Sequence, residues 1–238
     1  MRILEVKSLT KDFGGLMALS NVDFYVDQGE VVGLIGPNGA GKTTLFNLIS
    51  GALTPNYGET RFKGENISRL KPNEVCRRGI ARTFQLVNLF FDMSVLENVL
   101  LSCLFRMPRP SHAEAMGESR DLLQFVGLSD FEEVPAKELT IANQKRLEVA
   151  RALATHPELL LLDEVMAGLN PAEVAEAIEL IGRVREKGVT ILMVEHVMKA
   201  IMDVSDRVIV LHNGMIIAEG TPADIAAHET VIKVYLGE

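Results

Sequence analysis

The chain of 238 residues has only two cysteines and no tryptophan. It also lacks a long apolar run, since a membrane-spanning helix needs about 20 consecutive apolar residues and no run approaches that length. Cys76 and Cys103 are too few for a disulfide framework or a cysteine-based metal site. The segment from Met1 to Lys11 mixes charged and apolar side chains, which excludes a secretory signal peptide. We therefore expect a cytosolic protein, or one that is bound to a membrane only through a partner.

The chain also lacks a positive charge balance. Its formal net charge is −8, and it is 47% hydrophobic and 24% charged, which is the composition of a globular protein. This acidic balance argues against a nucleic-acid partner. A loose basic run is formed by Lys71, Arg77, Arg78 and Arg82, and we expect it on a solvated face.

The most informative motif runs from Gly36 to Thr43 and fits the phosphate-loop pattern G-x-x-x-x-G-K-[ST]. A predicted strand over 31–35 precedes it and a predicted helix over 44–49 follows it. In this arrangement backbone N–H groups and the positive end of a helix dipole point at one place, which suits a phosphate group. The alternative interpretation is a simple Gly-rich turn between the strand and the helix. Lys42 would reach the β- and γ-phosphates, and the Thr43 hydroxyl would hold Mg²⁺. We assign to nucleotide binding Gly36, Pro37, Asn38, Gly39, Ala40, Gly41, Lys42, Thr43 and Thr44.

Two acids follow a second buried strand, which is predicted over 158–162. Open α/β sheets bind ligands at the carboxyl ends of their strands, so Asp163 and Glu164 should lie near the phosphate loop. Asp163 would bind Mg²⁺, through water, and Glu164 would orient or deprotonate the attacking water. A charged strand end without a function is the alternative.

Gln85 and His196 also follow predicted strands. Taken alone, each is more often a surface residue or a satisfied polar residue. Beside a γ-phosphate, Gln85 can contact Mg²⁺ and the nucleophilic water, and His196 can hydrogen-bond the phosphate and Glu164. We therefore predict that Glu164, His196 and Gln85 are catalytic, and that Thr43, Gln85 and Asp163 hold the metal.

The hydrophobic patterning predicts an α/β fold. Alternating apolar residues at Val22, Phe24 and Val26 indicate a half-buried strand, and further turns are expected at 63–65 and 213–214. Helices are predicted over 94–106, 112–125, 141–155 and 171–188, with another from Thr221. Strands that alternate with helices predict a parallel sheet covered on both faces, in a single domain over 1–238. The helical stretch over 86–157 interrupts this alternation, so we interpret it as an inserted subdomain.

The order of these motifs resembles the ATPase subunit of an ATP-binding cassette (ABC) transporter over essentially the whole chain. The segment Leu139-Thr140-Ile141-Ala142-Asn143 stands at the family's signature position. The segments Ala81–Gln85 and Ala167–Pro171 are similar to the ATPases of branched-chain amino acid importers. The resemblance implies a P-loop NTPase core with a mostly parallel sheet, an N-terminal antiparallel β subdomain and an inserted helical subdomain. It also implies that Phe13 stacks on adenine.

The resemblance further implies partners and a place in the cell. Two ATPase subunits, identical or paralogous, would pack head to tail around two ATP molecules and Mg²⁺. Thr140 and Ala142 of one subunit would then complete the nucleotide site of the other. Polytopic permease subunits would bind the segment from Gln85 to Val99, and a solute-binding protein would act through them. The chain would lie on the cytoplasmic face of the membrane. Phe90, Phe91 and Met93 would be either exposed anchors for the permease or buried.

The signature departs from the family's usual L-S-G-G-Q. Ala142 keeps a backbone N–H, but we expect its methyl group to crowd a phosphate, and a positive φ there would cost about 1–2 kcal/mol. We therefore expect an active but slow ATPase, in which Ala142→Gly raises turnover.

Alternative functions remain at this point. A transporter of this type could carry urea, short amides or another small solute. A soluble cassette ATPase usually has two cassettes or long coiled coils, and this chain has neither. A nucleotide-dependent regulator without turnover is disfavoured by the presence of both Glu164 and His196.

Overall fold

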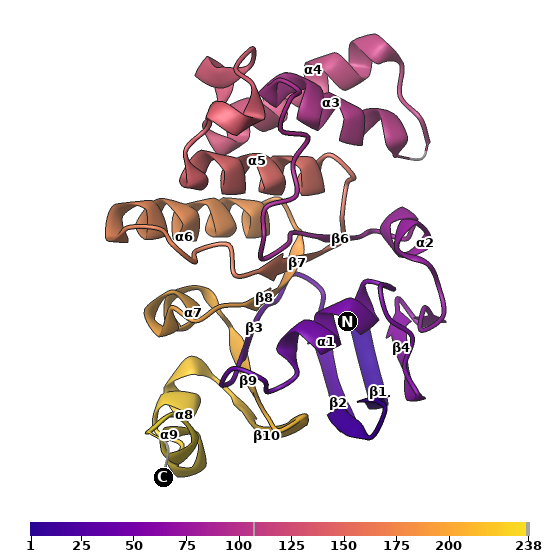
Figure 1. Ribbon diagram of the computed structural model, residues 1–238, viewed down its shortest axis with the longest axis vertical. Coiled ribbons are helices and arrows are strands. Elements are labelled where there is room, and N and C mark those ends of the chain that lie inside the picture. The colour runs from indigo at the N-terminus through magenta and orange to yellow at the C-terminus, as the bar shows by residue number, and fades with distance from the viewer. Residues whose placement is uncertain (107, 237–238) are drawn as a thin grey trace.

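The computed structural model describes residues 1–106 and 108–236, and it contains two β-sheets with helices around them (Figure 1). The strands are β1 (Arg2–Phe13), β2 (Leu16–Asp27), β3 (Val31–Ile35), β4 (Tyr57–Phe62), β5 (Glu65–Asn66), β6 (Ile80–Arg82), β7 (Leu159–Asp163), β8 (Thr190–Val194), β9 (Arg207–His212) and β10 (Met215–Gly220). The α-helices are α1 (Lys42–Ile49), α2 (Pro72–Arg77), α3 (Val95–Phe105), α4 (His112–Val126), α5 (Ile141–Leu153), α6 (Pro171–Glu186), α7 (Met198–Val204), α8 (Pro222–Ala226) and α9 (Glu229–Leu236).

The larger sheet has six strands in the order β10-β9-β3-β8-β7-β6. All neighbours in it pair in parallel except β10, which joins β9 through an antiparallel hairpin at the predicted turn over 213–214. Every residue of β3, β7 and β8 is buried, which explains why these strands are continuous apolar runs in the sequence. The predicted α/β class with a mostly parallel sheet is confirmed.

The two faces of this sheet pack against different layers. Alternate residues such as Leu160 and Met193 belong to the core that includes α5, α6 and α7. Their neighbours Leu161 and Leu192 belong to a second core, which includes α1 and the antiparallel sheet. Because side chains alternate across a strand, each strand of the parallel sheet contributes to both cores.

The smaller sheet has the order β2-β1-β4-β5 and is antiparallel throughout. Val22, Phe24 and Val26 are buried as their alternation predicts. The turn between β4 and β5 places Lys63 and Gly64 in the left-handed region, with φ values of 51° and 81°. This sheet corresponds to the predicted N-terminal β subdomain, and β4 and β5 return to it after α1.

Helices α3, α4 and α5 pack together at one end of the molecule (Figure 1). Ser94 and Ser111 form capping boxes at the starts of α3 and α4, and Gly127 ends α4 in the left-handed region, so the predicted boundaries hold within about two residues. Leu147 and Ala150 of α5 share one core with β7 and β8. The helical stretch is therefore joined to the sheet by continuous packing, and its limits at 86–157 stay a prediction.

Some elements differ from the sequence prediction. Helices α2, α7 and α9 were not predicted, since each has at most eight residues and so offers only about two turns of sequence pattern. Strand β7 begins and ends one residue later than expected, so Asp163 is its last residue. Among the described helices, none is both long and apolar enough to cross a membrane.

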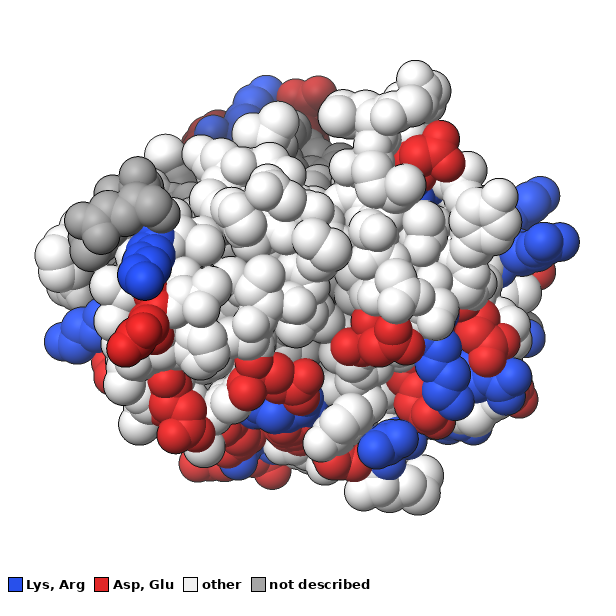
Figure 2. Space-filling view, turned by 90° about the horizontal axis from the view of Figure 1, so that it is seen from below, with Lys and Arg blue, Asp and Glu red and all other residues white. Residues whose placement is uncertain are grey.

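Figure 2 shows the end of the molecule that carries α8, α9 and β10. Lys and Arg lie among Asp and Glu around the rim of this face, and its middle is uncharged. Charges of both signs are thus interspersed there, in keeping with an acidic chain that still has 24 basic residues.

Candidate functional site

The parallel sheet brings four loops to one edge. The segments that follow β3, β6, β7 and β8 all leave from the carboxyl ends of neighbouring strands. They surround a cavity of about 320 Å³ that is lined by the phosphate loop and by Gln85, Glu164 and His196. Residues that are far apart in the sequence therefore share one site, as the position of ligand sites in α/β sheets predicts.

The phosphate loop fits closely against its neighbours. Gly36 has a φ of 155°, and a Cβ added there would lie 2.0 Å from the carbonyl oxygen of Leu211. Gly41 has a φ of 107° and caps the N-terminus of α1; a Cβ there would lie 2.5 Å from the carbonyl oxygen of Ala18. These two positions require glycine, and they place the start of α1 at the cavity.

Lys42 lies inside the loop. Its Nζ donates hydrogen bonds to the carbonyl oxygens of Gly36, at 2.6 Å, and Pro37, at 3.1 Å. Burial lowers the pKa of Lys42, while the negative charges of Glu164 and Asp163 oppose that change. A buried cation of this kind suits a ligand that carries concentrated negative charge.

Two of the predicted catalytic side chains, Gln85 and His196, contact the third, Glu164. Oε1 of Glu164 lies 2.8 Å from Nε2 of His196, and Oε2 accepts a hydrogen bond from Nε2 of Gln85 at 2.8 Å. The Glu164 side chain is 12% exposed, whereas Gln85 and His196 are exposed. The carboxylate is thus oriented by a partner on each oxygen and still borders the cavity.

Asp163 forms a buried ion pair that the sequence did not reveal. Nη2 of Arg82 lies 2.7 Å from Oδ2 of Asp163, and the two side chains are 9% and 3% exposed. Arg82 also donates to Asn47 of α1 and to Ser50, which caps the C-terminus of that helix. The expectation that Arg82 lies on a solvated face is wrong, because its guanidinium joins β7 to the helix that follows the phosphate loop.

The donor set fits a magnesium ion. Thr43 and Gln85 line the cavity and would offer a hydroxyl and an amide oxygen, which are ligand types that Mg²⁺ prefers. Asp163 is buried behind them and is not among the lining residues, so its carboxylate would act on the metal through water. Mg²⁺ is usually held by one or two carboxylates together with phosphate oxygens, and a single buried carboxylate here agrees with that.

Comparison with known proteins identifies the family. A family model described as "ABC transporter" matches residues 19–167. The chain belongs to the ABC transporter family. A second model, described as "Branched-chain amino acid ATP-binding cassette transporter", matches residues 215–238. The cassette is 44% identical to the high-affinity branched-chain amino acid transport ATP-binding protein BraF of Pseudomonas aeruginosa, over 99% of this chain and 98% of that protein.

Solved structures confirm the predicted cassette fold. The ADP conformation of MJ1267, an ATP-binding cassette of an ABC transporter, is 32% identical with a TM-score of 0.91, and each chain is covered completely. A dimeric post-hydrolysis state of the cassette MJ0796, bound to ADP and Pi, is 28% identical with a TM-score of 0.83. That match covers 92% of this chain and 98% of the other.

The remaining predicted site residues lie apart from the cavity. Phe13 is 48% exposed at the end of β1, with Nζ of Lys11 5.1 Å from its ring centroid. In the cassette the cavity is lined on that side by Leu16, Met17 and Ala18 rather than by Phe13. The expected stacking of adenine on Phe13 therefore stays a prediction.

The signature residues begin α5. The Thr140 hydroxyl accepts a hydrogen bond at 3.3 Å from the N–H of Asn143 and so caps the helix. Ala142 has a helical backbone rather than a positive φ, and it is 7% exposed beside Val165 and Leu169. The expectation of strain and of a crowding methyl group is wrong, because this methyl packs into its own subunit. The neighbouring Ile141 is 59% exposed.

Four charged residues at or near the site were missed by the sequence analysis. Arg82 is the last residue of β6, and Glu195 follows β8. Lys145 and Glu148 lie in α5, and charged residues in a helix are usually exposed to solvent. Burial raises the pKa of Glu195 to about 7, and its Oε1 accepts a hydrogen bond from the N–H of Met166 at 2.7 Å. The sequence could not predict these roles, since the partners of each side chain are distant along the chain.

We predict that Arg82→Met lowers the free energy of unfolding by about 3 kcal/mol, because it leaves the buried Asp163 carboxylate without its partner. Urea unfolding measures this loss as a lower midpoint concentration of urea, with the m-value unchanged. Arg78→Met is the matched control, since it breaks the exposed ion pair with Glu65 and should cost about 0.5 kcal/mol or less. Equal losses in the two variants would contradict the importance of the buried pair.

Proposed function

We propose that this chain is the ATP-hydrolysing subunit of an ABC importer for branched-chain amino acids. The observation that carries the proposal is the hydrogen-bonded group of Gln85, Glu164 and His196 at the phosphate loop. A loop that only bound nucleotide would not require a carboxylate held between an amide and an imidazole. The similarity to BraF over 99% of the chain supports the transport role and the class of solute.

The residues of the site have separate tasks in hydrolysis. Backbone N–H groups of the phosphate loop and Lys42 bind the phosphates of ATP, and Lys42 exchanges its bonds to Gly36 and Pro37 for phosphate oxygens. Glu164 accepts a proton from the attacking water or orients it, and His196 donates a hydrogen bond to the γ-phosphate. Bound Mg²⁺, held by Thr43, Asp163 and Gln85, would neutralise charge on the phosphates.

A second subunit completes this site in our proposal. The first N–H groups of α5 have no acceptor within the helix, and Thr140 already caps Asn143. Since α5 begins outside the cavity of its own chain, its free N–H groups are available to a nucleotide bound by another copy or by a paralogue. The dimeric MJ0796 cassette provides a precedent for such pairing.

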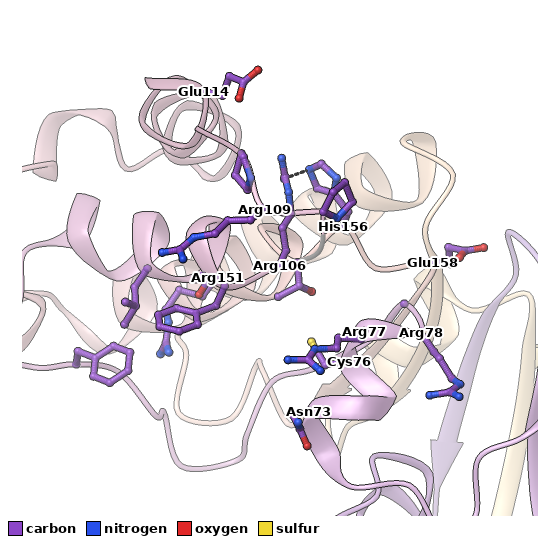
Figure 3. A pocket seen from close by; sticks show the side chains of 18 residues that line it. Asn73, Cys76, Arg77, Arg78, Arg106, Arg109, Glu114, Arg151, His156 and Glu158 are labelled. Atoms are coloured by element: carbon purple, nitrogen blue, oxygen red, sulfur yellow. Dashed lines mark hydrogen bonds between the residues drawn. The ribbon is translucent and has the colours of Figure 1, made fainter. Parts of the chain in front are cut away.

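A separate cleft fits a membrane subunit. It has a volume of about 950 Å³ and lies between α2, the ends of α3 and α5, and the start of α4 (Figure 3). The exposed Phe90 and Phe105 line it together with several arginines, namely Arg77, Arg78, Arg106, Arg109 and Arg151. We assign to this cleft a cytoplasmic helix of a permease that has an apolar face and acidic side chains. Phe90 is 45% exposed, as an anchor for such a helix would be, whereas Phe91, at 42% exposed, is not among the residues that line the cleft.

Uptake into membrane vesicles tests the proposed function. The chain is purified from membranes together with the polytopic subunits that accompany it, and ATP-dependent uptake of leucine and of urea is measured side by side. We expect uptake of leucine, with urea at background. Uptake of urea without uptake of leucine would show that the solute is not a branched-chain amino acid. Absence of a polytopic partner would contradict the transport role.

We predict that Ala142→Gly does not raise ATP turnover in the assembled transporter. The methyl group is buried in its own subunit, and glycine in the first turn of α5 costs up to about 1 kcal/mol of helix stability. The matched variant Ile141→Ala trims the side chain that does project, and we expect the increase in kcat there. A rise in kcat of more than about threefold in Ala142→Gly alone would restore the steric argument.

A further inference from the structure

Helix α5 carries two buried charged side chains that bond to loops on other elements. Lys145 is 8% and Glu148 4% exposed. Ionised groups are costly to bury, and their hydrogen bonds show what compensates for that cost. Both side chains bond to backbone groups of the loops that carry the predicted hydrolytic residues.

Glu148 holds the loop after β6. Its Oε1 accepts hydrogen bonds from the N–H groups of Phe84 and Asn88, each at 3.2 Å. Nη1 of Arg151, one turn further along α5, donates to the carbonyl oxygen of Asn88. Gln85 lies between the two residues that Glu148 contacts, so this part of the loop is tied to α5 on both sides of Gln85.

Lys145 holds the turn after β7. Its Nζ donates to the carbonyl oxygens of Glu164, at 2.9 Å, and Ala167, at 2.7 Å. The N–H of Ala167 also donates to the carbonyl of Glu164 at 3.2 Å, which closes the turn. Glu164 has a φ of 52°, and a residue other than glycine stays in this left-handed region only when its surroundings fix it.

We propose that Lys145 and Glu148 are positioning residues for hydrolysis. Lys145 fixes the backbone from which Glu164 reaches the attacking water, and Glu148 fixes the loop that carries Gln85. The same helix presents its N-terminus to the nucleotide of the second subunit. A single rigid helix thereby links the contact with the partner's nucleotide to the hydrolytic geometry of its own subunit. This inference rests on the proposed function of Glu164 and Gln85.

Packing alone does not require these charges. Leu147, Val149 and Ala150 of the same helix are buried apolar residues that belong to the main core. Methionine at position 145 or 148 would fill similar volume without a charge to desolvate. Burial lowers the pKa of Lys145 and raises that of Glu148 to about 7, so both groups are held where their charged forms are disfavoured.

Amide hydrogen–deuterium exchange combined with steady-state kinetics tests the proposal in the full chain and in the assembled transporter. In Glu148→Met we expect exchange over residues 84–88 to rise at least about tenfold, and kcat to fall by a similar factor while KM changes less than about threefold. Glu148→Gln should restore both values, because its amide oxygen can accept the same two N–H bonds. In Lys145→Met the faster exchange should appear over residues 164–167 instead, with the same loss in kcat.

Val149→Ala is the matched control on α5, and it should lower overall stability without faster exchange in either loop. If Glu148→Met does not fold, Glu148→Asp makes the same comparison, since its carboxylate is one methylene too short to reach both N–H groups. Exchange and kcat within about twofold of wild type in Glu148→Met, or a Gln variant as impaired as the Met variant, would overturn the proposal. Absence of MgATP turnover in the wild type would refute the proposed function, whereas the exchange measurements would still decide whether these residues hold the loops.

Discussion

The parallel pairing of β3, β8, β7 and β6 is the constraint on which the rest of this structure depends. The register aligns Leu34 of β3 and Asp163 of β7 with the same residue, Val194 of β8. Strands β3, β7 and β8 therefore end within one residue of one another, β6 ends two residues earlier, and the loops after all four strands meet at one edge. Slippage of β8 by one residue would move its side chains to opposite faces and would separate the groups of the site. The chemistry of the cassette is thus a consequence of how the strands pair.

Buried charge is the second organising feature. Lys42 lies inside the phosphate loop, Arg82 neutralises Asp163, and Lys145 and Glu148 hold the backbones of two loops. Each of these groups loses hydration, and each is compensated by hydrogen bonds to fixed backbone or side-chain atoms. Such bonds fix direction more strictly than apolar contacts do. An enzyme that moves phosphoryl groups needs that precision at several charged atoms at once.

Much of the fold and of the candidate site could be predicted from the sequence, because the signals are local. The phosphate loop, the capping boxes at Ser94 and Ser111 and the alternation in β2 each involve a few neighbouring residues. The buried partner of Asp163 could not be predicted, since Arg82 is 81 residues away and has the type of a surface residue. The conformation of Ala142 was also mistaken, because comparison with glycine in the signature suggested a backbone that α5 does not adopt. Long-range pairing and helix capping decided these two cases.

The most direct test of the account is to separate binding from hydrolysis at Glu164 in the assembled transporter. Glu164→Gln keeps the size of the side chain and an oxygen for hydrogen bonding, but it removes the carboxylate. The account predicts that MgATP binds with a Kd within about threefold of wild type while kcat falls at least about 100-fold. Glu186→Gln, at the exposed end of α6, serves as the control with unchanged kcat. A kcat for Glu164→Gln within about threefold of wild type would contradict the claim that these converging loops form the hydrolytic site.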